Sequence, residues 1–377
     1  MNQVLSTLGA TAYRSVVKPV LFRISPDAVH SFAIRTGVFI QHSSLALATL
    51  KSVWSYSNPQ RLSQHIQGVY IKNPIGLSAG FDKSIEVPAV MRAVGFGFME
   101  GGTVTNKPYA GNPRPWFYRL PHSGSLIVHA GLANEGIDKV LHRLRVSKKN
   151  AFVDFPLNIS VAHTNTQKPQ SEDEMINDIS ETLKKVKRAD IAQLITLNIS
   201  CPNTYHGEVF TKPGQLEHLL TRVDALSLKQ PIFLKMPCDL VWGDFDALLA
   251  VAAKHHVSGV TICNLTKSRK NVSALDTLPA FESGGLSGKL IFEQSNRLIA
   301  QTYKSYGSRF VIIGVGGVST AADAYKKMRL GASLVEMVTG LIYEGPQVVG
   351  TINKGIVELL KKDGFRTVKD IIGIDAA

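Results

Sequence analysis

Four residues in this 377-residue sequence are candidates for acid–base or redox chemistry, because of their side chains and the segments in which they lie. Cys201 lies in NISCPN, directly after an apolar run, where an accessible thiol can remove a carbon-bound proton; an inert small residue is the other interpretation. Thr204 follows closely and can relay that proton to water. Lys83 ends AGFDK and either reaches into a site or stands on an exposed loop. Lys235 interrupts the apolar run PIFLKMPC, so we expect it to be buried, beside an electron-rich ring or paired with a carboxylate.

Glycine loops and amide side chains accompany these four residues. The segment GVGG at 314–317 precedes a predicted helix, and Val338-Thr339-Gly340 offers a second set of backbone amides. Such amides bind phosphate, so the two loops predict a phosphate-bearing cofactor. A third loop, GGLSG at 284–288, is either a plain turn or part of the same rim. Amides that end apolar runs predict recognition of a flat polar ring, although any single one can simply anchor a loop; they are Asn158, Asn198, Asn203 and Asn264.

Eight short apolar runs, each followed by an amphipathic stretch, are the elements that position these residues. The predicted strands are 71–79, 96–104, 152–160, 192–200, 231–238, 257–265, 309–317 and 332–339. The predicted helices are 84–94, 134–147, 171–188, 214–228, 243–256, 289–306, 319–329 and 345–362. Eight such pairs predict a (β/α)₈ TIM barrel over residues 61–377, with function at the carboxyl ends of the strands. A doubly wound open sheet is less consistent, because no G-x-G-x-x-G opens a helix near the first strand.

Residues 1–60 form an N-terminal extension of different character. They contain one acidic residue, Asp27, against five basic ones. Two amphipathic helices are predicted, at 8–22 and 26–50, and the second places Val29, Phe32, Ala33 and Ile40 on one face. This pattern leaves two alternatives: a helical cap packed on the barrel, or a contact with a membrane surface.

The composition narrows the class of protein. A hydrophobic fraction of 44% with 19% charged residues is typical of a globular chain. The net charge of +13 comes from scattered basic residues without a nucleic-acid-binding motif, so we expect no nucleic-acid partner. No apolar run is long enough to span a bilayer, and the N-terminus does not read as a secretory signal. Three cysteines without metal-ligand spacing predict a reducing compartment and no metal site.

Several segments together resemble the dihydroorotate dehydrogenase family, chiefly its class 2, membrane-associated form. They are KPVLFRISPDAVHSFAIRTG, NPIGLSAGFDK, GNPRPWFYRL, NISCPNT, GGLSG, VIIGVGGVST and YEGPQVV, and they cover nearly the whole chain. The resemblance implies FMN-dependent oxidation of dihydroorotate to orotate, with electrons passed to a membrane quinone. It also implies a peripheral location at the cytoplasmic face of a bacterial inner membrane, or at an equivalent organelle membrane.

The resemblance assigns roles residue by residue. Cys201 is the base, with Thr204 and Lys83 beside it in the catalytic set. The extension becomes the membrane-docking and quinone-access element, and Arg119 matches a residue lining the quinone tunnel. The implied FMN contacts are Ala79, Gly80, Thr103, Asn158, Asn198, Lys235, Gly288, Gly317, Val338 and Thr339. The implied substrate contacts are Lys83, Gly131, Leu132, Asn198, Asn203 and Asn264.

Three positions depart from the class 2 pattern. Cys201 stands where class 2 has serine and class 1 has cysteine, and the greater acidity of a thiol predicts activity extending to lower pH. Residues 128–133 read VHAGLA where the family has Asn-Arg-x-Gly-Phe-Asn, so Val128 cannot hold the carboxylate of orotate. Leu265 replaces a threonine.

These departures leave alternatives open. Either His129 or Lys83 replaces the lost contact to the carboxylate, or the substrate is an uncharged dihydropyrimidine such as dihydrouracil. A flavoprotein that has lost turnover and acts as a sensor is another hypothesis, and a soluble class 1-like enzyme using fumarate or a nicotinamide is a third.

Overall fold

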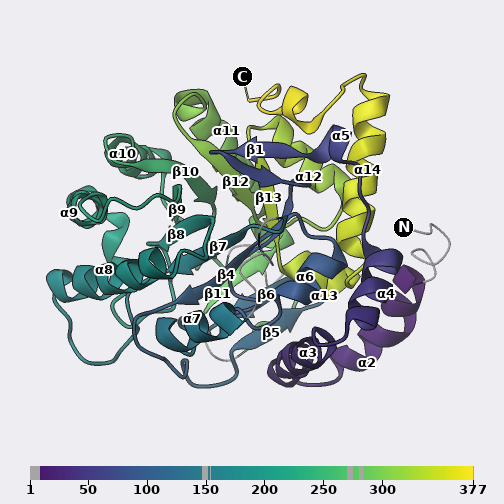
Figure 1. Ribbon diagram of the computed structural model, residues 1–377, viewed down its shortest axis with the longest axis horizontal. Helices are drawn as coiled ribbons and strands as arrows, with labels where there is room; N and C mark the ends of the chain where they lie inside the picture. The colour runs from purple at the N-terminus through teal and green to yellow at the C-terminus, as the bar shows by residue number, and fades with distance from the viewer. Residues whose placement is uncertain (1–8, 147–151, 153, 270–274, 280–283, 377) are drawn as a thin grey trace.

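Eight parallel strands form a closed barrel at the centre of the molecule (Figure 1). The computed structural model describes residues 9–146, 152, 154–269, 275–279 and 284–376. Residues 1–8 of the predicted extension, residue 147 of a predicted helix and residue 153 of a predicted strand lie outside these ranges. The barrel strands follow one another in chain order: β3(Ile75–Leu77), β4(Phe98–Val104), β7(Leu157–Val161), β8(Leu194–Asn198), β9(Ile232–Lys235), β10(Val257–Ile262), β12(Val311–Val315) and β13(Leu334–Met337). Each overlaps a predicted run, and the predicted (β/α)₈ fold is confirmed.

Helices cover the outside of the barrel, which is why the strands read as continuous apolar runs. The helices that follow the strands are α6(Pro88–Val94), α7(Ile137–Val146), α8(Glu172–Ala189), α9(Pro213–Asp224), α10(Trp242–Ala252), α11(Phe292–Tyr306), α12(Ala321–Arg329) and α14(Val348–Lys362). Shorter helices are α5(Pro59–Leu62), η3(Val209–Thr211), η4(Lys289–Ile291), α13(Thr339–Glu344) and η5(Val368–Ile371). Local signals fix their ends: Ser171 and Glu174 form a capping box at the start of α8. The barrel and its helices share one large apolar core.

Two small antiparallel sheets were not predicted. The hairpin β1(Gln64–Ile66)–β2(Val69–Ile71) precedes the barrel, and a three-stranded sheet has the order β11-β6-β5. Its strands are β5(Phe117–Leu120), β6(Ser125–Val128) and β11(Gly285–Gly288). The stretch 284–288 is therefore mostly a strand, although its glycines suggested a loop. Pairing of Gly285 with Val128 brings this segment next to the altered 128–133 region.

The N-terminal extension contains more breaks than predicted. A π-helical turn, η1(Tyr13–Val17), continues into α2(Lys18–Phe22), as expected for 8–22. The single helix predicted over 26–50 is wrong, because the chain forms α3(Pro26–Ile40) and α4(Ser44–Trp54) with a new N-cap between them. The Ser43 hydroxyl accepts a hydrogen bond from the Ala46 amide at 3.2 Å and starts the second helix. None of the described helices is long and apolar enough to cross a bilayer.

The packed face of α3 also differs from the predicted one. Ile34 and Gly37 are buried, and a Cβ at Gly37 would lie 2.7 Å from Val87 Cγ1. Phe32, by contrast, is 65% exposed. Close packing through a glycine, rather than through the bulky residues, therefore decides which face of α3 meets the barrel.

Asp27 fastens α3 to the rest of the molecule. It is buried and accepts hydrogen bonds from Arg114 Nη1 at 2.7 Å, from the Trp116 amide at 3.1 Å and from the Phe117 amide at 3.3 Å. A buried carboxylate needs such partners. The acidic residue of the extension thus holds α3 against the start of β5.

Candidate active site

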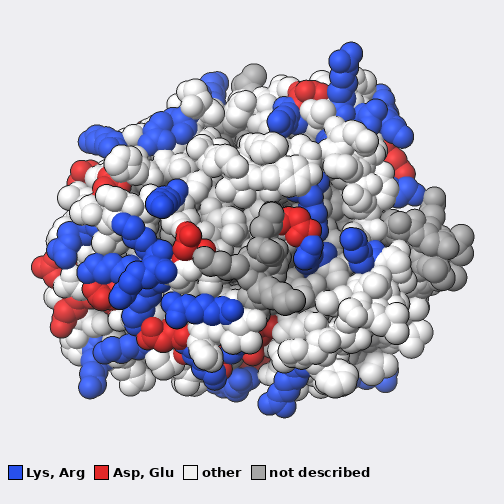
Figure 2. Space-filling view, viewed as in Figure 1, with Lys and Arg blue, Asp and Glu red and all other residues white. Residues whose placement is uncertain are grey.

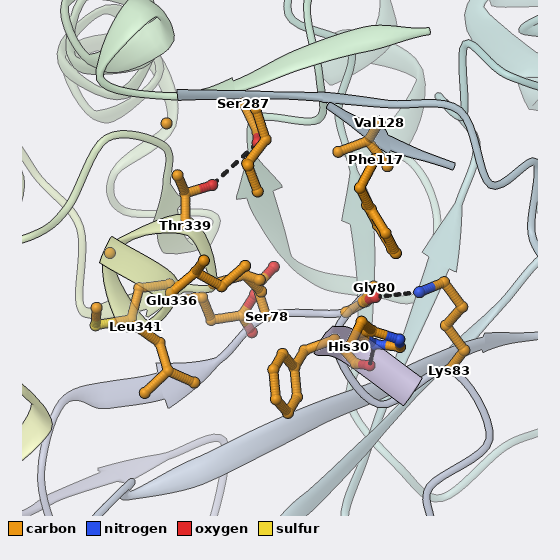
Figure 3. Close-up of a pocket in the computed structure, with 18 of the residues that line it drawn as sticks. His30, Ser78, Gly80, Lys83, Phe117, Val128, Ser287, Glu336, Thr339 and Leu341 are labelled. Atoms are coloured by element: carbon orange, nitrogen blue, oxygen red, sulfur yellow. Dashed lines mark hydrogen bonds between the residues drawn. The ribbon is translucent and has the colours of Figure 1, made fainter. Parts of the chain in front are cut away.

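A cavity of about 430 Å³ lies at the carboxyl ends of the barrel strands and extends between the N-terminal helices (Figure 3). Of the residues predicted for the site, those that line the cavity are Ala79, Gly80, Lys83, Thr103, Arg119, Gly131, Leu132, Asn198, Cys201, Asn203, Lys235, Asn264, Gly288, Gly317, Val338 and Thr339. They come from segments more than 250 residues apart in sequence. The barrel therefore brings together most of the set that the sequence singled out.

Asn158 and Thr204 are not part of the cavity wall. Asn158 is fully buried, its Nδ2 donates to Thr196 Oγ1 at 2.8 Å, and its Oδ1 has no partner among the described residues. The Thr204 hydroxyl donates to the Gly207 carbonyl at 2.7 Å, so it is engaged within its own loop.

Cys201 follows β8 on the cavity wall and is half-buried. Burial raises the pKa of its thiol to about 11, although the hydrogen bond from the Asn203 backbone lowers it. Burial therefore offsets part of the acidity that a thiol has in solution, and activity that extends to lower pH than with serine stays a prediction. At neutral pH the side chain is a thiol, and its basic form becomes more populated as the pH rises.

Lys83 also lines the cavity, near the His30 side chain of the extension (Figure 3). Its Nζ donates to the Gly80 carbonyl at 2.8 Å and lies 4.7 Å from the centre of the Phe117 ring (Figure 3). Burial lowers the pKa of Lys83 to about 8. An anion bound in the cavity would stabilise the charged form of this lysine.

The predicted amides form a hydrogen-bonded row along the barrel mouth. Asn264 Nδ2 donates to Asn198 Oδ1 at 3.1 Å, and Asn198 Nδ2 donates to Thr103 Oγ1 at 2.9 Å. Asn203 is held from both sides, because its Nδ2 donates to the Val128 carbonyl at 3.0 Å and its carbonyl accepts from Asn112 Nδ2 at 2.9 Å. These bonds fix the amide planes and leave a preorganised polar rim.

The altered segment 128–133 places an apolar side chain in the cavity, since Val128 lines the wall. His129 does not line it. Its Nε2 lies 3.4 Å from Asn112 Nδ2, and burial lowers the pKa of the imidazole. The proposed compensation by His129 is therefore not supported by its position, and of the two candidates only Lys83 lines the cavity.

The opposite side of the cavity suits a phosphate and a ring system. Gly288 has φ +95°, and a Cβ there would lie 2.7 Å from the Gly124 carbonyl and 2.8 Å from Thr339 Cγ2. Gly317 has φ +74°, and its Cβ would lie 2.5 Å from Phe292 Cβ. Only glycine fits these two positions, so backbone rather than side chain faces the cavity there. Ser287 Oγ and Thr339 Oγ1, 3.0 Å apart, add hydroxyl groups to the same side (Figure 3).

Lys235 pairs with a carboxylate, as one interpretation of its position predicted, and its place beside a cofactor ring stays a prediction. It lines the cavity, and its Nζ lies 3.3 Å from Glu100 Oε1 and 3.3 Å from Ser78 Oγ. A lysine, amides and glycine-lined backbone therefore surround one cavity, and this set fits a phosphate-bearing flavin.

Residues of the extension complete the cavity, and most of them carried no chemical signal in the sequence. Tyr13, Leu21, His30 and Trp54 all line it. His30 is neutral, because burial lowers its pKa to about 3, and its Nε2 hydrogen-bonds to the Phe81 carbonyl at 2.7 Å. Arg119 Nη1 donates to the Ile24 carbonyl at 2.7 Å and joins β5 to the segment between α2 and α3.

Comparisons with known proteins agree with this geometry. The dihydroorotate dehydrogenase family matches residues 61–360. A dihydroorotate dehydrogenase (quinone) of Parvibaculum lavamentivorans is 32% identical over 361 residues, covering 96% of this chain and 98% of the relative. One of Rhizobium rhizogenes is 33% identical over 373 residues, covering 96% of each chain.

Solved structures show the same similarity. The Eimeria tenella DHODH in complex with ferulenol has a TM-score of 0.82 at 27% identity, covering 93% of this chain and 96% of that one. Its ligand-free form has a TM-score of 0.80 at 28% identity, covering 90% and 98%. The resemblance seen in the sequence is confirmed: the chain belongs to the dihydroorotate dehydrogenase family, whose members are flavin-dependent oxidoreductases acting on CH–CH bonds.

Proposed function

We propose that this protein oxidises dihydroorotate to orotate with FMN as its cofactor and passes the electrons to a quinone. In this proposal residues 61–377 form the catalytic barrel, and residues 1–60 give the quinone access to it. The observation that carries the proposal is the single cavity that joins Cys201 and the asparagines to Tyr13, Leu21 and Trp54 of the extension. The family assignment and the printed names of the relatives support it.

Bound FMN would supply a two-electron acceptor for the hydride from C6 of the substrate. Lys235, Thr103 and Asn198 would hold its ring, and the backbone at Gly288 and Gly317 would hold its phosphate. Cys201 removes the proton from C5 of the dihydropyrimidine. Thr204 can take this proton onward only when its hydroxyl leaves the Gly207 carbonyl.

Asn198, Asn203 and Asn264 orient the substrate ring, with Gly131 and Leu132 closing over it. Such positioning aligns the proton transfer and the hydride transfer. Lys83 binds the carboxylate of the substrate, because the Val128 side chain offers no hydrogen-bond donor. The bound anion in turn stabilises the charged form of the lysine. The apolar Val128 side chain also motivates a second candidate, the uncharged substrate dihydrouracil.

Anaerobic addition of dihydroorotate to the FMN-loaded protein should bleach the flavin absorbance, and a short-chain ubiquinone should then restore it. Fumarate and NAD⁺, added in place of the quinone, should restore it at least about tenfold more slowly if the acceptor is discriminated by its shape and polarity. Faster reoxidation by fumarate or NAD⁺ would contradict the quinone assignment. A flavin that neither dihydroorotate nor dihydrouracil bleaches would instead support a sensor without turnover.

We also propose that α2, α3 and α4 rest on a membrane surface, at the cytoplasmic face of a bacterial inner membrane or on an equivalent organelle membrane. Large apolar side chains are exposed on η1, on these helices and on the short segment that joins α2 to α3: Val16, Val17, Val20, Ile24, Phe32, Phe39 and Leu45. Figure 2 shows a largely uncharged surface over the region that α2 and α3 occupy in Figure 1. Basic residues of the extension, among them Lys18 and Arg35, supply attraction to anionic headgroups.

Replacing both Phe32 and Phe39 with serine should weaken sedimentation with phosphatidylglycerol-containing liposomes by about tenfold or more, because two exposed aromatic side chains no longer enter the bilayer. The matched control is Val241→Ser, which alters an apolar residue that is 69% exposed at the start of α10, far from the extension in sequence. Equal binding by the double variant and by the parent protein would refute the proposed docking surface.

A further inference from the structure

The barrel interior beside the cavity contains an unequal number of acidic and basic groups. Glu100 of β4 and Glu336 of β13 are both 0% exposed, and Lys235 of β9 is 5% exposed. Glu336 and Lys235 also line the cavity, and Figure 3 shows Glu336 among its walls near Ser78. Two carboxyl groups therefore face one lysine in a water-poor environment.

Lys235 forms an ion pair with only one of the two acids, Glu100. Its Nζ lies 3.3 Å from Glu100 Oε1 and donates to Ser78 Oγ at the same distance. Neither carboxyl oxygen of Glu336 has a hydrogen-bond partner among the described residues, and Glu100 Oε2 has none either. Lys235 thus pairs with Glu100, and among the described residues Glu336 has no ion-pair partner of its own.

An uncompensated carboxylate in a buried site is strongly unfavourable, and a second carboxylate nearby makes it more so. Burial raises the pKa of Glu336 well above its usual value, the charge of Glu100 raises it further, and Lys235 lowers it. The groups that face Glu336 from the neighbouring strands are these two and the Ser78 hydroxyl. The least unfavourable arrangement therefore has one proton between the two acids. One acid is then neutral, and the lysine balances the charge of the ionised one.

We propose that Glu100 and Glu336 share a single proton beside Lys235, and that Glu336 carries it, so that this buried group of two acids and one lysine carries no net charge. The protonation itself depends only on residues of this chain.

Infrared spectroscopy tests the protonation directly, because the carbonyl stretch of a protonated carboxyl group is separate from the bands of carboxylates. The difference spectrum between the FMN-loaded parent protein and Glu336→Gln at pH 7 should show one such band, shifted in D₂O. Glu100→Gln should abolish the same band, because Lys235 is then free to pair with an ionised Glu336. Glu181→Gln, at an exposed residue that pairs with Lys184 at 2.7 Å, should leave it unchanged.

A missing band in the parent protein, or a band that survives in Glu336→Gln, would overturn the proposal, and a band that survives in Glu100→Gln would refute the sharing. The spectra can be recorded whether or not FMN binds. A protein that shows the band but binds no FMN would therefore contradict the proposed function and leave the shared proton intact.

Discussion

Replacing Cys201 with alanine is expected to leave FMN bound and to slow the reduction of the flavin by dihydroorotate about 10²–10⁴-fold, the usual contribution of a general base. Cys201 lines the same cavity as Asn198 and Asn264, which would align the substrate ring with it. The alanine removes the proton acceptor without adding bulk. Stopped-flow recording of the flavin absorbance after anaerobic mixing measures this rate, and the absorbance before mixing reports the bound FMN.

The controls for this experiment use another cysteine and the pH. Cys238→Ala changes a buried thiol outside the cavity wall, and its flavin should be reduced at nearly the parent rate.

Because the pKa of Cys201 is raised to about 11, the rate of flavin reduction in the parent protein at saturating substrate should rise with pH from 7 towards 10. Cys201→Ala should lose this rise. The KM for dihydroorotate should increase above pH 8, where Lys83 loses its charge. A Cys201→Ala protein that bleaches at the parent rate would remove Cys201 from its role.

The Lys235→Met substitution is expected to lower the free energy of unfolding by about 3–5 kcal/mol, because it leaves the carboxylate of Glu100 buried without its cation. Urea denaturation without added FMN measures the loss, so that cofactor binding does not contribute.

The double variant Lys235→Met/Glu100→Gln is the matched control. It removes both members of the ion pair, leaves Glu336 as the acid of the interior, and should recover most of the lost stability. A single variant as stable as the parent, or a double variant no better than the single one, would show that the 3.3 Å contact between Lys235 and Glu100 contributes little.

The barrel was predictable because its strands are buried on both faces and therefore appear as continuous apolar runs. The same regularity made most of the site predictable, since parallel strands bring their carboxyl ends to one edge. Asn158 shows the limit of that argument. The predicted strand 152–160 placed it near a carboxyl end, but it is the second residue of β7 and is fully buried, so it lies too deep in the barrel to line the cavity.

Other features depend on contacts between distant segments. The sheet β5-β6-β11 pairs residues that are more than 150 positions apart through short strands that have no clear alternation. The burial of Gly37 against Val87, instead of Phe32, follows from close helix packing that an amphipathic pattern cannot specify. The pKa of Cys201 likewise reflects burial by surrounding elements, which raises it above the ordinary value of a thiol.

The substrate is the central claim, and a direct comparison of dihydroorotate with dihydrouracil as reductants of the bound flavin tests it most directly. Lys83 should form a charge-assisted contact with the carboxylate that dihydrouracil lacks, and such a contact is worth about 1.5–3 kcal/mol. The second-order rate constant of flavin bleaching should therefore be at least about tenfold higher for dihydroorotate, and Lys83→Met should reduce that preference. Equal or faster bleaching by dihydrouracil would contradict the account and assign the cavity to an uncharged dihydropyrimidine.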